Sequence, residues 1–70
     1  MDNKDIGVNI KRYAQEHGIM NRFLAEKAGV PDAKMSLILN GKQEIGVLEF
    51  FKICEALNVP AENFVKEQEG

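Results

Sequence analysis

The chain has few of the residues that build disulfide scaffolds, metal sites or membrane spans. Its 70 residues include one cysteine, Cys54, and one histidine, His17, so an internal disulfide and a cysteine-based zinc site are excluded. No apolar run approaches the length of a membrane span, and residues 1–14 lack the apolar stretch of a signal peptide. We therefore expect a cytoplasmic protein in a reducing compartment, without membrane contact and without a metal or other cofactor.

An excess of basic charge is also missing. Nine basic and eleven acidic residues give a net charge of −2, which argues against a strong and indiscriminate binder of nucleic acid. The charge is uneven, because residues 1–42 hold seven basic and five acidic residues, whereas residues 43–70 hold two basic and six acidic ones. The basic N-terminal part and the acidic C-terminal part of the chain are therefore suited to different partners.

The residue patterns of enzymes are absent as well. There is no carboxylate pair in a cleft-forming context, no nucleophile beside a base, and no glycine-rich loop for phosphate. His17 fits the last turn of a helix, and Cys54 has the apolar neighbours of a buried thiol. We expect no catalytic residue and no small-molecule substrate.

Helical periodicity and helix stops predict an all-α fold in a single domain over residues 1–70. The stops are Gly18, Gly29, Asn40–Gly41 and Asn58–Pro60. The predicted helices cover about residues 5–17, 21–28, 31–39, 46–57 and 60–65.

Apolar spacing also predicts which helix faces are buried. In the second helix the inward stripe includes Phe23 and Leu24, and in the third it includes Met35 and Ile38. The predicted buried side of the fourth helix is longer and consists of Val47, Phe50, Phe51, Cys54 and Leu57.

The centre of the chain has the spacing of a helix-turn-helix. Ala25 lies four residues before Gly29, Met35 lies six after it, and Ile38 follows three residues later. A small residue at position 25 lets the two helices cross closely, and Gly29 can adopt a left-handed turn. Met35 and Ile38 hold the third helix against the core, so its other face can enter a DNA major groove. The residues predicted to point outward are Asp32, Ala33, Ser36 and Leu37.

Over about residues 6–65 the chain resembles the lambda-repressor-like, Cro/CI-type (XRE) helix-turn-helix domain. The resemblance implies a compact five-helix bundle around a central helix-turn-helix, and commonly a homodimer that binds a two-fold-related site in double-stranded DNA. Residues 66–70 are expected to be a frayed tail. The matching stretches are Ile6-Gly7-x-x-Ile10, Gly18-Ile19, Leu24 to Val30, Met35-x-x-Ile38, Asn40-Gly41-Lys42 and Lys52 to Pro60.

The resemblance assigns base reading to the outward residues of the third helix. Asp32 is either an acceptor for a cytosine amino group or only a first-turn acid. Ala33 and Leu37 can touch thymine methyl groups, although an exposed leucine fits a protein partner equally well. Ser36 discriminates little because a hydroxyl both donates and accepts.

Phosphate contacts are implied at the rim of this helix pair, together with backbone amides at the start of the second helix and around residues 40–41. Asn21 takes the place of the family's usual glutamine, and it either contacts phosphate or caps the second helix, since Met20 replaces the usual Ser or Thr cap. The candidate residues are Asn21, Arg22, Lys34, Asn40 and Lys42.

A further departure from the family concerns the core. Family members often pair an Arg with a Glu at the positions of Ala14 and Leu39, and both charges are absent here. We therefore expect Leu39 to pack towards Ala14 and Tyr13.

The C-terminal part of the chain has more large apolar residues than a minimal core needs, so some of them are expected at a dimer interface. These residues are Phe50, Phe51, Phe64 and Val65.

The favoured function is a sequence-specific DNA-binding transcriptional regulator, a small dimeric repressor of phage or mobile-element type. The alternative is the same fold used as a protein-interaction module, like an antitoxin or an anti-repressor. The acidic balance and the residues Asp32 and Leu37 on the reading face support this alternative.

Overall fold

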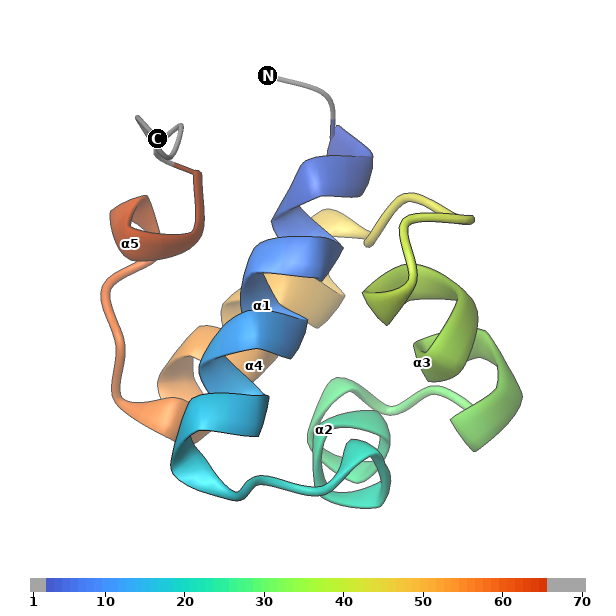
Figure 1. The fold of residues 1–70 in the computed structure, drawn as a ribbon, viewed down its shortest axis with the longest axis horizontal. Coiled ribbons are helices and arrows are strands. Elements are labelled where there is room, and N and C mark those ends of the chain that lie inside the picture. Colours follow the sequence, from blue (N-terminus) through green and yellow to red (C-terminus); the bar gives the residue numbers. More distant parts are fainter. Residues whose placement is uncertain (1–2, 66–70) are drawn as a thin grey trace.

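The computed structural model describes residues 3–65, which form five α-helices and no strand. Helix α1 crosses in front of α4, while α3 and α5 lie on opposite sides of the bundle (Figure 1). The predicted frayed tail, residues 66–70, lies outside the described residues. The helices are α1 (Asn3–His17), α2 (Asn21–Ala28), α3 (Asp32–Leu39), α4 (Val47–Leu57) and α5 (Glu62–Val65).

The first four helices end in the same way. Gly18, Gly29, Gly41 and Asn58 have φ values of 67°, 76°, 71° and 55°. In each case the next residue donates its N–H to the carbonyl five positions earlier, at 2.8–3.1 Å. This left-handed cap uses carbonyl groups that a helix end leaves unpaired. The predicted helix stops are therefore confirmed.

The core confirms the predicted anchors of α3. Met35 and Ile38 are fully buried, and so are Leu24 of α2 and Ile53 of α4. Cys54 is also buried among apolar side chains, and its loss of solvent raises the pKa of the thiol.

The prediction for the missing ion pair is confirmed too. Leu39 is 1% exposed and Ala14 is 2% exposed, and both belong to one buried cluster against which Tyr13 packs. Helices α1 and α3, which carry these residues, pack against each other. An apolar pair therefore fills the space that a buried ion pair would otherwise occupy, at little cost in stability.

Helices α1 and α3 approach closely at Gly7. A Cβ atom on this buried glycine would overlap the carbonyl oxygen of Ile38. Any larger residue would force the two helices apart, so Gly7 sets the position of α3 on the bundle.

The predicted buried faces of α2 and α4 were partly wrong. Phe23 is 39% exposed, Val47 is 70% exposed and Phe51 is 54% exposed. Ile53, which was not in the predicted stripe, is fully buried, and Leu48 is 72% exposed. Apolar residues are so dense along α4 that two overlapping stripes have helical spacing, and only packing against α2 and α5 selects between them.

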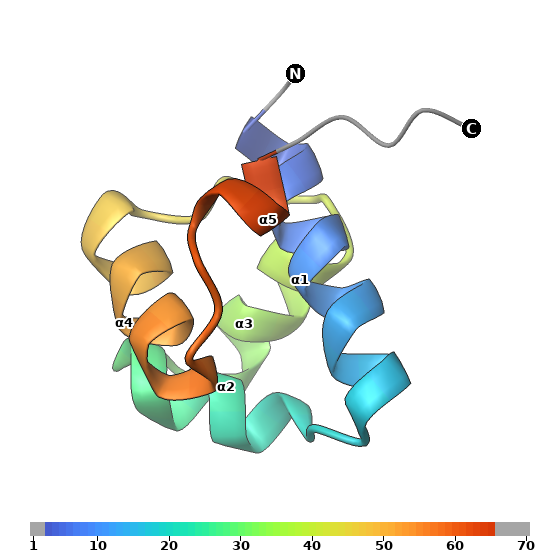
Figure 2. The ribbon, with the colours of Figure 1, turned by 90° about the vertical axis from the view of Figure 1, so that its left-hand side faces the viewer.

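The single turn of α5 is attached to α1 and α4 by one buried side chain. The ring of Phe64 meets those of Tyr13 and Phe50 edge-on, with centroids 5.6 and 6.2 Å apart. The side-chain amide of Asn9 on α1 donates to the Phe64 carbonyl at 2.7 Å. Figure 2 shows α5 in front of the first turns of α1, with the segment that leads to it running between α4 and α1.

Candidate nucleic-acid interface

The corner between α2 and α3 is a three-residue connection that begins with Gly29. Its N–H donates to the Ala25 carbonyl at 2.9 Å, and the N–H of Val30 donates to the same oxygen at 3.0 Å. A Cβ on Gly29 would meet nothing within 4 Å, so its positive φ, and not crowding, is what favours glycine. Ala25 is 1% exposed at the contact of α2 with α3, in agreement with the predicted need for a small residue.

This corner leaves one face of α3 in solvent. Asp32, Ala33 and Leu37 are exposed, and Leu37 keeps 46% of its surface. Lys34 and Ser36 are half-buried on the flanks of the same face. The predicted outward orientation is therefore confirmed for Asp32, Ala33 and Leu37, whereas Ser36 is only half-exposed. Contact with DNA stays a prediction.

Lys34 reaches a carboxylate of its own chain. Its Nζ lies 3.1 Å from Oε2 of Glu49 in the first turn of α4. The other oxygen of Glu49 accepts the N–H of Gly46 at 2.9 Å and so caps the start of α4. The Gly46 hydrogen bond, with help from Lys34, lowers the pKa of Glu49. The charge of Lys34 is thus partly compensated within the molecule, and Glu49 joins α3 to α4.

Two more polar side chains of this face are engaged inside the chain. Lys11 of α1 donates to Oδ1 of Asn40 at 2.6 Å, and the amide nitrogen of Asn40 donates to Oγ of Ser36 at 3.4 Å. Lys11 and Glu49 were not predicted from the sequence, because their contacts join residues 29 and 15 positions apart. No local pattern indicates such pairs.

The start of α2 corrects the proposed capping role of Asn21. Met20 is the N-cap residue, with ψ of 148° and no side-chain cap, while Asn21 is already helical. A residue inside the helix cannot supply the cap, so that alternative for Asn21 is wrong. The first amides of α2 thus lack a side-chain acceptor, and Asn21 and Arg22 are both exposed beside them. Phosphate contact remains the prediction for both residues.

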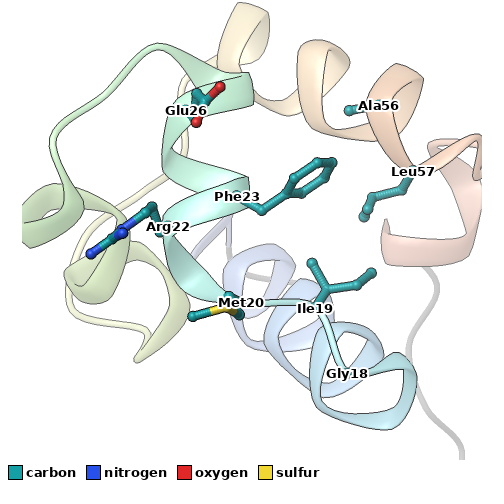
Figure 3. A pocket seen from close by; sticks show the side chains of 8 residues that line it. All are labelled: Gly18, Ile19, Met20, Arg22, Phe23, Glu26, Ala56 and Leu57. Atoms are coloured by element: carbon teal, nitrogen blue, oxygen red, sulfur yellow. The ribbon is translucent and has the colours of Figure 1, made fainter.

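An apolar depression of about 570 Å³ lies between the start of α2 and the end of α4. Ile19, Phe23 and Leu57 point into it, whereas the Arg22 side chain points away (Figure 3). No residue of α3 lines it. The depression is therefore separate from the outward face of α3.

A short helix pair with a left-handed glycine corner and an exposed second helix defines a helix-turn-helix domain. The chain belongs to the Cro/C1-type HTH DNA-binding domain family, whose sequence model matches residues 9–66. Membership of this family supports DNA as the partner and transcription regulation as the role. A comparison with curated proteins found no match. In the described part of the chain, no helix combines the length and hydropathy needed to cross a membrane.

Proposed function

We propose that this protein is a sequence-specific transcriptional regulator that places α3 in the major groove, a small repressor of phage or mobile-element type that acts in the cytoplasm. The observation that carries the proposal is the exposed face of α3, held outward by buried Met35 and Ile38. A rigid helix that projects from a bundle is the element that this class of protein uses to read base edges.

Positive charge beside α3 supports DNA as the ligand. Arg22 at the start of α2 and Lys42 after α3 are exposed, and neither forms an ion pair with another described residue. Both cations are available to phosphate, with Asn21 and the first amides of α2 nearby in sequence. If each of two subunits neutralises about three phosphates, the binding constant falls with salt with a log–log slope of roughly −5.

We further propose that the protein binds as a homodimer, because one such domain reads only a few base pairs. Val47, Leu48 and Phe51 are exposed on neighbouring positions of one α4 face and form an apolar patch. Val65, also from the predicted interface set, is 39% exposed, whereas Phe50 and Phe64 belong to the core. A Phe51→Glu variant should remain monomeric in sedimentation at concentrations where the wild type dimerises, and should lose affinity for a two-fold site.

The experiment that tests DNA recognition is selection from a random duplex pool with the purified protein at low salt. Enrichment of a common motif supports the proposal. Lys42→Ala should then weaken binding to all sequences alike, whereas substitution of Ser36 or Leu37 should change the preferred motif.

The alternative is a protein-interaction module, and a specific observation favours it. Leu37 and Asp32 are both exposed on α3, an apolar and an acidic side chain, while the positive charge of Lys34 is compensated by Glu49. A selection that enriches no motif at low salt would support this alternative over DNA binding.

A further inference from the structure

The side chains that normally read bases are largely unavailable on α3. The helix contains no arginine, glutamine or asparagine between Asp32 and Leu39. Its lysine, Lys34, is held by Glu49 at 3.1 Å, and the Ser36 hydroxyl accepts from Asn40, which itself accepts from Lys11. The donors that would recognise guanine O6 and N7 or the adenine edge are therefore absent or already engaged.

Two apolar side chains remain on the same face. Ala33 and Leu37 are four residues apart, one helical turn, and both are exposed. The buried side of the helix belongs to Met35 and Ile38, so Ala33 and Leu37 face away from the core. Asp32, the residue before Ala33, is exposed as well, and its carboxylate can only accept hydrogen bonds, which disfavours the acceptor-rich edge of guanine.

The C5 methyl group of thymine is the apolar feature that the major groove presents. We infer that α3 selects its DNA site mainly through thymine methyl groups, with Leu37 and Ala33 as the specificity-determining side chains. This inference rests on the proposed function, since it names the feature of DNA that the same face would read. Burial of one methyl group against an aliphatic side chain corresponds to about a four-fold gain in affinity.

Replacement of single thymines by deoxyuridine tests the inference, because it deletes only the methyl group. In the motif obtained by selection, replacement of one such thymine by deoxyuridine should weaken binding about four-fold, and we expect one or two thymines of this kind in each half-site. Replacement of equivalent thymines in both half-sites should weaken binding about sixteen-fold. Thymines in the flanking sequence should show no effect. Binding is measured by fluorescence anisotropy at fixed salt.

A double substitution, of protein and DNA, assigns the effect to a side chain. Leu37→Ser should bind the thymine and uracil duplexes equally at the position that it contacts, with a thermal midpoint close to the wild type because Leu37 lies at the surface. Lys42→Ala is the matched control: it should weaken both duplexes and keep their ratio. Discrimination that persists in Leu37→Ser would overturn the role of Leu37.

The two hypotheses fail in distinguishable ways. If the selected motif binds tightly but no thymine shows a methyl effect, the inference is overturned and DNA recognition stands. If no motif is enriched, both are overturned.

Discussion

Substitution of Gly7 by alanine tests how closely α1 and α3 must pack. The added methyl group would overlap the backbone carbonyl of Ile38, which cannot rotate away as a side chain could. Overpacking lowers the free energy of unfolding by up to about 3 kcal/mol, and a clash with backbone belongs at the upper end of that range. Alanine recovers about 1 kcal/mol through its better helix propensity. We therefore expect a net loss of about 2 kcal/mol in the free energy of unfolding.

Thermal and urea denaturation, followed by circular dichroism, measure this loss. In a domain of this size about 2 kcal/mol lowers the melting temperature by about 8–16 °C. Gln15→Ala is the matched control, because Gln15 is exposed on the same helix and should change stability by less than about 0.5 kcal/mol. A Gly7→Ala variant as stable as the wild type would refute the close approach of the two helices.

Further substitutions address a cap, a turn and the core. Glu49→Gln removes a charged cap of α4 and should cost about 1 kcal/mol at pH 7. Folding lowers the pKa of Glu49 from 4.5, so the Glu49 carboxylate contributes its full stabilisation above that pH. This stabilisation is lost as the pH falls through the folded-state pKa. The melting temperatures of wild type and variant should therefore converge in acid. Gly29→Ala should cost about 1 kcal/mol from its positive φ alone, and a larger loss would indicate crowding that the structure does not show. Leu39→Glu should cost about 3–5 kcal/mol as an unpaired buried charge, and adding Ala14→Arg should recover part of it. Melts that show no recovery in the double variant would contradict the packing of α1 against α3 at these positions.

Local signals in the sequence predicted most of the fold. Glycines and Asn58 marked the ends of four helices, because a left-handed residue is needed there and few residue types adopt it. The spacing of Ala25, Gly29, Met35 and Ile38 predicted the helix-turn-helix corner and hence which residues of α3 face outward. The family resemblance, and not a local signal, pointed to positions 14 and 39: both charges of the family's usual pair are absent there, which predicted an apolar contact, since one charge alone would be costly.

The candidate site was only half predictable. Lys34, Ser36 and Asn40 were predicted to be available to DNA. In the structure all three form side-chain hydrogen bonds within the chain. Their partners include Lys11 and Glu49, which lie on other helices. Local sequence patterns do not predict which side chains of different helices lie within hydrogen-bonding distance.

The sequence by itself determined the presence of five helices, the ends of the first four, and the sharp corner after α2, since each depends on residues within a few positions of one another. Tertiary structure alone decided which of two apolar stripes on α4 is buried, leaving Val47 and Phe51 in solvent. It also decided which polar groups beside α3 remain unpaired. The physical reason is the same in both cases: burial and long-range pairing depend on how whole helices are placed against each other, and periodicity along one helix does not contain that placement.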